Sequence, residues 1–171
     1  LISKKKYKKE DLIEAGLAFY SGLRVVDFFR NRVMFPLFDH RDNVVGFSGR
    51  AIDENQPAGG YGGKYINTRD TIVYHKGSMF FGLNTAKEEI KKLDKAIIVE
   101  GELDVISCFS VGIKNVVAVK GTALTENQVT LISRFTNNVC LCFDQDEAGY
   151  EATKRSLPVL EKKGINITTC I

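Results

Sequence analysis

The sequence predicts an α/β protein in which a smaller mixed α+β lobe precedes a parallel sheet flanked by helices. From residue 95 onward, short apolar runs alternate with segments of helical periodicity, as in β-α-β units. The runs at 96–99 and 139–143 are partly β-branched or aromatic and end at polar residues, which is typical of buried parallel strands. Residues 1–93 hold 16 Lys and Arg against 11 Asp and Glu, net +5, whereas residues 94–171 hold 8 against 10, net −2. We therefore expect a basic lobe at 1–93 and the sheet domain at 94–171.

The basic lobe combines a lysine-rich start, a short helix that ends at a glycine, and a β-hairpin around Arg41-Asp42-Asn43. Pro36 places the first strand of this hairpin at a sheet edge. The glycine-rich stretch 57–64 lacks the spacing of a Walker A phosphate loop and is expected to be a connection. The expected elements are helices at 10–17 and 83–93 and strands at 33–39 and 44–50.

The sheet domain follows a strand-helix order that implies right-handed crossovers. Thr125 and Gln128 form a capping box at the start of its second helix. The chain starts at Leu1 rather than Met, and its last strand stops at Ile171, so we expect an excerpt of a longer protein. The expected strands are 96–100, 115–119, 139–144 and 165–171, and the expected helices are about 103–111, 126–135 and 148–163.

The composition, with 44% apolar and 26% charged residues, is ordinary for a soluble globular protein, and we expect it in the cytoplasm from its cysteine usage. No apolar run approaches the roughly 20 residues that a membrane helix needs, so we expect neither a membrane partner nor a signal peptide. The cysteines at 108, 140, 142 and 170 form no C-x-x-C pair. We therefore expect them to be small buried hydrophobes in a reducing compartment, with no zinc site and no disulfide framework.

Carboxylates follow two of the apolar runs. Glu100 ends the first run, and Asp144 and Asp146 follow the second, on an extended segment where side chains two apart face the same way. The ends of parallel strands carry the chemistry of such sheets, and ligands that are only oxygen favour Mg²⁺ or Mn²⁺ over zinc. An isolated D-x-D is usually a turn or helix-start signal, but its combination with Glu100 favours a metal site. Asp104 is a further ligand or supporting partner, or an ordinary first-turn helix acid.

These strand ends and the turn Gly121-Thr122-Ala123-Leu124-Thr125, in this order and spacing, resemble the toprim domain. Bacterial primases share that domain with type IA and type II topoisomerases and with some nucleases. The first lobe narrows the resemblance, since the segments 30–37, 46–50, 64–68 and 75–77 look like successive motifs of the DnaG-type replicative primase core. The resemblance covers nearly the whole chain from about Leu12.

The resemblance implies synthesis of RNA primers from ribonucleoside triphosphates on a single-stranded DNA template. It implies two metal ions held by Glu100, Asp144 and Asp146, with Glu100 also a candidate base. The basic positions that would line a groove for nucleotide and template are Arg30, Arg32, Arg50, Lys64 and Lys76, with Asn67 as a polar nucleotide contact. Full-length relatives add a zinc ribbon, a domain that binds the replicative helicase, and a further acidic cluster. We therefore expect no zinc in this fragment and impaired activity of the fragment alone.

Two residues depart from the family pattern. Glu102 stands where an aromatic residue is usual and is expected to add negative charge near the metals. Gln145 replaces the glycine of D-G-D, at about 1 kcal/mol if that position needs positive φ. Two other functions stay open: a non-catalytic nucleic-acid-binding module whose affinity ignores magnesium, and a toprim nuclease or topoisomerase. The motifs of the first lobe belong to neither.

Overall fold

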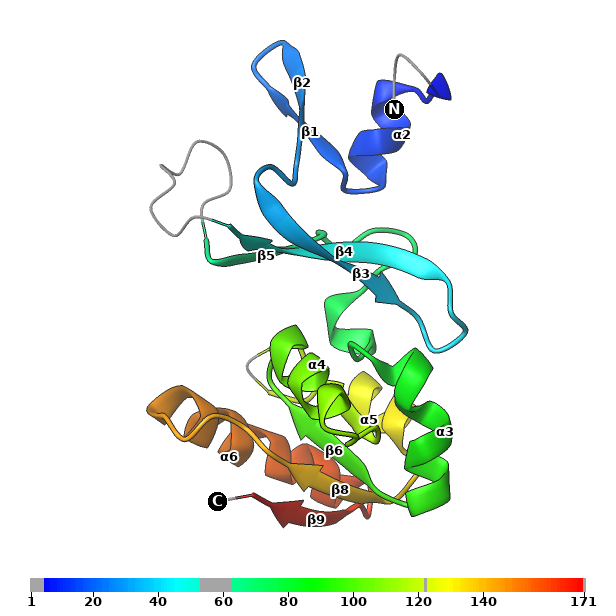
Figure 1. Ribbon diagram of the computed structural model, residues 1–171, viewed down its shortest axis with the longest axis vertical. Coiled ribbons are helices and arrows are strands. Elements are labelled where there is room, and N and C mark those ends of the chain that lie inside the picture. Colours follow the sequence, from blue (N-terminus) through cyan, green and yellow to red (C-terminus); the bar gives the residue numbers. More distant parts are fainter. Residues whose placement is uncertain (1–4, 53–62, 122, 171) are drawn as a thin grey trace. The chain divides into compact units, whose positions relative to one another are not determined.

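The computed structural model describes residues 5–52, 63–121 and 123–170, and the chain divides into two compact units (Figure 1). The first unit comprises residues 1–37 and 44–75, and the second comprises residues 38–43 and 76–171. Parallel strands with flanking helices in the second unit confirm the predicted fold class. Helix α3 (Leu83–Leu93), which the sequence places in the first lobe, clusters with the second unit because its buried side chains join the core of the parallel sheet.

The first unit carries two small sheets. Strands β1 (Ala18–Ser21) and β2 (Arg24–Asp27) pair as an antiparallel hairpin that the sequence does not predict, because both strands are short and half of their residues are exposed. The other sheet has the order β3-β4-β5, so β3 is an edge strand, as Pro36 predicts. Of the glycine-rich stretch 57–64, residues 57–62 lie outside the described residues. The remaining elements of this unit are α2 (Lys9–Glu14), β3 (Arg32–Phe38), β4 (Val44–Ala51) and β5 (Tyr65–Asn67).

The second unit is built around a parallel sheet with the order β7-β6-β8-β9. Strand β6 is central. It pairs with β8, whose residues lie 43 positions further along the chain, as in the pair Ile98↔Leu141. Apart from the short helix η1, which the sequence did not predict, the elements match the predicted ranges to within three residues at each end. They are η1 (Lys76–Ser78), β6 (Ala96–Val99), α4 (Glu102–Ser110), β7 (Val116–Ala118), α5 (Glu126–Ile132), β8 (Asn138–Leu141), α6 (Glu147–Lys162) and β9 (Asn166–Thr169).

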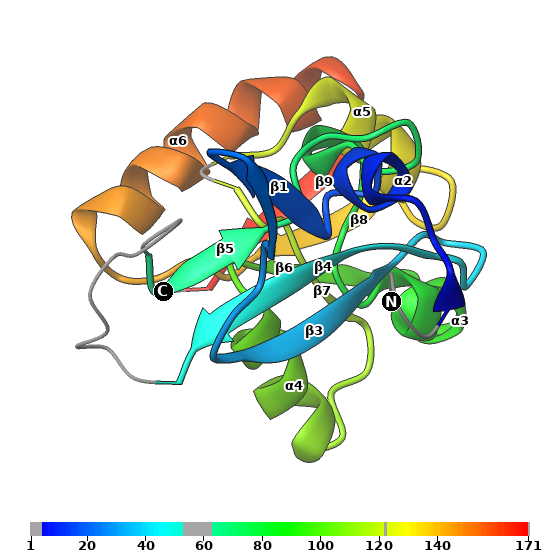
Figure 2. The same ribbon diagram turned by 90° about the horizontal axis from the view of Figure 1, so that it is seen from above.

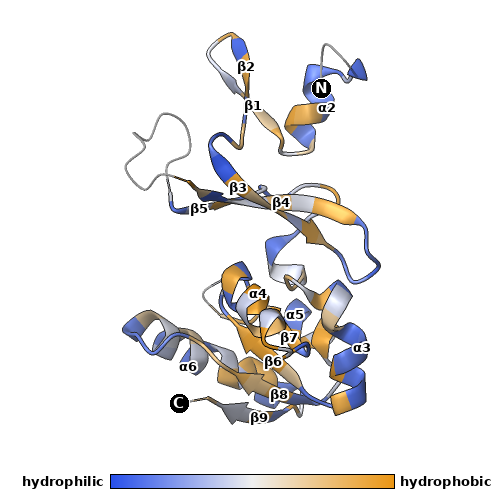
Figure 3. Cartoon of the chain, viewed as in Figure 1, coloured by the Kyte–Doolittle hydropathy of each residue, from blue (hydrophilic) through white to orange (hydrophobic). Residues whose placement is uncertain are grey.

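Alternate side chains of this sheet point into two apolar clusters. Ile98 and Leu141 belong to the larger one, with residues of α3, α5 and α6. Ile97 and Cys142 pack with the smaller one, which includes Val105 of α4. Figure 2 shows α5 and α6 on one side of the sheet and α4 on the other. Strands β6, β7 and β8 are strongly hydrophobic in Figure 3, in keeping with burial on both faces. Among the described residues, no helix has the length and apolar character to cross a membrane.

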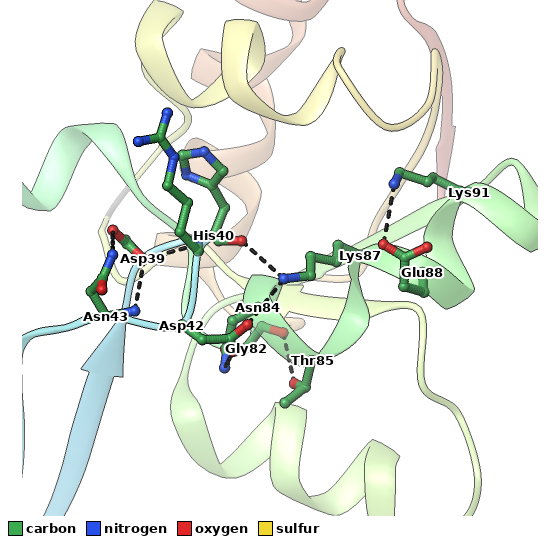
Figure 4. A network of polar contacts seen from close by, with 11 residues as sticks. Asp39, His40, Asp42, Asn43, Gly82, Asn84, Thr85, Lys87, Glu88 and Lys91 are labelled. Carbon is green, nitrogen blue, oxygen red and sulfur yellow. Dashed lines mark hydrogen bonds and ion pairs between the residues drawn. The ribbon is translucent and has the colours of Figure 1, made fainter.

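A polar network holds the loop before β4 against α3 (Figure 4). Lys87 Nζ donates to the His40 carbonyl at 3.0 Å and to the Asp42 carboxylate at 3.1 Å. Asn84 Nδ2 donates to the other Asp42 oxygen at 2.9 Å. The hydrogen bond from Asn84, followed by that from Lys87, lowers the pKa of Asp42. These contacts explain why residues 38–43 cluster with the second unit.

Candidate metal site and nucleic-acid-binding residues

Glu100 and Asp144 meet at the edge of the sheet where its parallel strands end. Glu100 follows β6 directly, Asp144 follows the adjacent β8, and the backbone N–H of Asp144 donates to Glu100 Oε1 at 3.0 Å. Partial burial raises the pKa of Glu100, and the charges of Asp144, Asp146 and Asp104 raise it further against the opposing hydrogen bond from Asp144. Carboxylates that raise the proton affinity of a neighbour also attract other cations. The structure thus places Glu100 against the Asp144 backbone, with Asp146 and Asp104 near enough for their charges to act on Glu100.

Asp146 and Asp104 both accept hydrogen bonds at helix starts. Asp146 is the N-cap of α6, and its Oδ1 accepts from the backbone N–H of Gly149 at 2.8 Å. Asp104 lies in the first turn of α4, and its Oδ2 accepts from the backbone N–H of Gly101, the N-cap of that helix, at 2.9 Å. Both carboxylates therefore have the helix-start role that the sequence left open. A carboxylate has two oxygens, so this role is compatible with a bond to a cation through the other.

Gly149 fixes the turn that carries Asp144. A Cβ at this position would overlap the Asp144 carbonyl oxygen and lie 2.9 Å from both the Asp144 nitrogen and the carbonyl carbon. The chain can therefore close here only around a glycine. The sequence analysis assigned Gly149 no role, although a glycine in the first turn of a helix, where better helix formers are usual, is a signal that could have found it. Gln145 is not among the described residues with positive φ, so the cost considered for it does not arise.

Glu102 does not bring an unbalanced negative charge to the acidic edge of the sheet, so that expectation is wrong. Its side chain is 6% exposed and pairs with Lys120, whose side chain is 2% exposed. Burial lowers the pKa of Lys120, and the Glu102 carboxylate opposes this shift only in part. The pair escaped the sequence analysis because 18 residues separate its members in the chain.

Three cysteines form a cluster that the sequence analysis also missed. The Sγ atoms of Cys140, Cys142 and Cys170 all lie within 4.8 Å of one another. In the described part of the chain, no three carboxylates come this close together. Cys142 and Cys170 form a disulfide. The expectation of buried cysteines without a disulfide is therefore wrong for Cys142 and Cys170, whereas Cys140 is a buried free thiol as expected. A search for C-x-x-C overlooks residues two apart on a strand, which face the same way, and a partner on the neighbouring strand.

The basic residues differ in what they contact. Arg32 Nη1 donates to the carbonyls of Gly63 and Gly49 at 2.9 and 3.1 Å, and so helps to hold β3, β4 and the approach to β5 together. The Arg50 guanidinium lies 5.7 Å from the centroid of the Tyr65 ring. Asn67 Oδ1 is buried and has no hydrogen-bond partner among the described residues. Arg30, Lys64 and Lys76 are exposed.

Comparison with known proteins agrees with this geometry. Residues 1–87 match the family described as DNA primase catalytic core, N-terminal domain, and residues 97–171 match the Toprim-like family, whose domains in general bind divalent metal ions. A DNA primase of Clostridium acetobutylicum is 44% identical over 164 residues, which are 95% of this chain and 26% of that protein. A DNA primase of Aquifex aeolicus is also 44% identical, over 168 residues that are 95% of this chain and 33% of that protein.

Solved structures give the same result. The crystal structure of the Aquifex aeolicus primase zinc-binding and RNA polymerase domains matches with a TM-score of 0.84 and 42% identity, over 94% of this chain and 39% of that one. A DnaG primase catalytic domain bound to single-stranded DNA matches with a TM-score of 0.75 and 38% identity, over 85% of this chain and 44% of that one. The chain spans about a quarter to a third of the length of its curated relatives. Because the primase-core family matches residues 1–87 of 171 and the Toprim-like family follows it, the chain belongs to the DnaG-type DNA primase catalytic cores.

Proposed function

We propose that this chain is the catalytic part of a DNA primase, which synthesises RNA primers on single-stranded DNA by metal-dependent nucleotidyl transfer. The observation that carries the proposal is the contact between Glu100 and the Asp144 backbone, at the ends of adjacent parallel strands, in a chain of the primase-core family. A toprim nuclease or topoisomerase would leave residues 1–87 without an explanation.

Glu100, Asp144 and Asp146 would hold two Mg²⁺ or Mn²⁺ ions, with Asp104 as a further ligand. The donor set fits these cations because it consists of carboxylate oxygens alone. It also fits because the neighbouring negative charges raise the pKa of Glu100, and a divalent cation would relieve that repulsion. When bound, such ions lower the pKa of an attacking hydroxyl and neutralise charge on the phosphates. The proton affinity of Glu100 makes it the candidate base.

Single-stranded DNA and ribonucleoside triphosphates would bind to the basic residues. Arg50 beside the Tyr65 ring combines a phosphate-binding guanidinium with an aromatic face on which a base can stack. The buried Asn67 Oδ1 is an acceptor that a nucleotide donor could satisfy. The remaining candidates for phosphate contact are Arg30, Arg32, Lys64 and Lys76. A related catalytic domain is bound to single-stranded DNA, which supports this assignment.

The protein would act in the cytoplasm, without a membrane partner, and would meet the replicative helicase through a domain outside this chain. Both inferences rest on family membership.

Primer synthesis by the full-length protein tests the proposal. Asp146→Asn removes the charge but keeps an N-cap, since Asn caps helices as well as Asp does. With labelled ribonucleotides on single-stranded DNA, we expect Asp144→Asn and Asp146→Asn each to lower primer yield by roughly a hundredfold or more, since metal-ion stabilisation is worth several kcal/mol. Glu151→Gln, which removes an exposed charge from the same helix, should keep the wild-type yield. Wild-type yield in both aspartate variants would refute the proposed site. If the wild-type protein itself binds single-stranded DNA but makes no primer, the result supports the non-catalytic module instead.

A further inference from the structure

The three-cysteine cluster has no part in the proposed function. Cys140 lies in β8, Cys142 lies just after β8, and Cys170 lies just after β9. The backbone N–H of Cys170 donates to the Leu141 carbonyl at 2.9 Å, which continues the parallel register and sets Cys170 opposite Cys142. Their Cα atoms are 5.0 Å apart, inside the range of about 4.4–6.8 Å that a disulfide requires. The backbone of the two strands is thus already placed for a bond.

The three cysteines, which are all thiols in the reduced chain, differ in their access to solvent. Cys170 is exposed, Cys142 is half-buried and Cys140 is buried. Cys140 Sγ lies 3.5 Å from the Cys170 sulfur and 3.7 Å from the Cys142 sulfur. A reagent in solution therefore reaches Cys170 first, and a sulfur modified there has two other thiols within contact distance.

The number of donors favours a disulfide over a metal ion. A closed zinc site takes four ligands, and in the described part of the chain the cluster contains three, with no His, Asp or Glu among them. A disulfide needs only the two residues that face each other. Disulfides in cytosolic proteins are usually transient and redox-sensing, which suits an exposed position.

We propose that Cys142 and Cys170 are a reversible oxidation site. Hydrogen peroxide oxidises the Cys170 thiol to a sulfenic acid and is itself reduced to water. The Cys142 sulfur then attacks the Cys170 sulfur, an S–S bond forms, and the sulfenic oxygen leaves with the remaining thiol proton as a second water. Two thiols and one peroxide thus give one disulfide and two waters. A dithiol reductant reverses the reaction by thiol–disulfide exchange.

The bond has a structural consequence for β9. Within the described residues this strand pairs with β8 alone, and three of its four residues are exposed. Strands held by so few buried contacts open readily. Oxidation links the carboxyl ends of β8 and β9 across 28 residues of sequence, a segment that contains all of α6 and the Asp144 loop. The oxidised form therefore keeps β9 paired where the reduced form lets it open.

Intact mass of the reduced chain, before and after treatment with hydrogen peroxide, tests the proposal. We expect the wild type to lose about 2 Da, to regain it with dithiothreitol, and to yield a peptide that links Cys142 to Cys170. Cys170→Ser should abolish the loss. Cys142→Ser should still react, through Cys140 instead, because that sulfur is 3.5 Å from Cys170. Cys108→Ser is the matched control, since Cys108 is a free thiol outside the cluster, and it should react as the wild type does.

Hydrogen exchange provides the second measurement, with slower exchange of the β9 amides expected in the oxidised form. The proposal is overturned if Cys170→Ser loses mass as fast as the wild type, or if the bonds formed join two chains. It is overturned equally if one equivalent of Zn²⁺ protects all three thiols of the reduced chain from alkylation, because the cluster is then a metal site. Unchanged exchange in β9 would contradict the structural consequence.

Discussion

Replacing one member of the buried Glu102–Lys120 pair should destabilise the protein far more than replacing both. The two side chains are 6% and 2% exposed, so either single variant, Glu102→Leu or Lys120→Met, leaves a charge in the interior that has lost this ion pair. The usual penalty for this is about 3–5 kcal/mol, which is a large part of the total stability of a domain. The double variant removes both charges and keeps similar volumes. We expect its stability to lie within about 1 kcal/mol of the wild type or above it.

Two smaller contributions do not change this expectation. Lys120 Nζ lies 6.0 Å from the centroid of the Phe81 ring, and loss of that contact costs at most about 2 kcal/mol. Lys120 has a positive φ of 55°, but Met and Lys bear the same backbone penalty there, so it cancels. The non-additivity of the two substitutions should therefore amount to several kcal/mol.

Urea unfolding followed by circular dichroism is the appropriate assay, because the chain has no Trp for fluorescence. Glu88→Gln serves as a control, since it breaks an ion pair whose members are 73% and 49% exposed, and it should change the free energy of unfolding by less than about 1 kcal/mol. The reasoning is refuted if each single variant loses less than about 1 kcal/mol, or if the loss in the double variant equals the sum of the single losses.

Three further predictions concern the acidic edge and the basic residues. The pKa of Glu100 is raised in the folded state, so stability in metal-free buffer should fall as the pH rises from 4.5, the ordinary pKa of Glu, through the raised pKa. Glu100→Gln should flatten this part of the profile of melting temperature against pH, and an equal slope in the variant would contradict the shift. Gly149→Ala should lower the free energy of unfolding by at least about 2 kcal/mol, because the added methyl overlaps the Asp144 backbone, and unchanged urea unfolding would exclude this packing. Arg50→Ala and Lys64→Ala should each reduce, by roughly 0.7, the slope of the logarithm of the single-strand binding constant against the logarithm of the salt concentration. Anisotropy titrations at several salt concentrations measure this slope, and unchanged affinity and slope would mean that these residues make no phosphate contact.

The sequence was sufficient for the parallel sheet because the signals there are local. Ile97 and Ile98 sit in a short run bounded by polar residues, and in the structure they point into the two clusters on opposite faces of the sheet. The capping box of Thr125 and Gln128 likewise fixed the start of α5, where the Gln128 backbone N–H donates to Thr125 Oγ1 at 3.1 Å. Such patterns need no knowledge of the tertiary fold.

The features that the sequence could not provide depend on contacts between distant residues. Lys120 reads as an ordinary surface lysine until the fold places it beside Glu102. Cys170 reads as an isolated cysteine until β9 pairs with β8. The helix-capping role of Asp146 was one of two readings of the D-x-D pair, and only the hydrogen bond from Gly149 establishes it.

Direct titration of this chain with Mn²⁺, with free Mn²⁺ followed by electron paramagnetic resonance, tests the acidic edge most directly. We predict saturable binding to the wild type, an affinity at least about tenfold lower in Asp144→Asn and in Glu100→Gln, and unchanged affinity in Cys170→Ser. A tenfold loss corresponds to about 1.4 kcal/mol, a modest share of what a carboxylate ligand contributes. If Asp144→Asn and Glu100→Gln bind Mn²⁺ as the wild type does, or if only Cys170→Ser loses binding, the cation does not lie on the carboxylates and the proposed centre for primer synthesis is wrong.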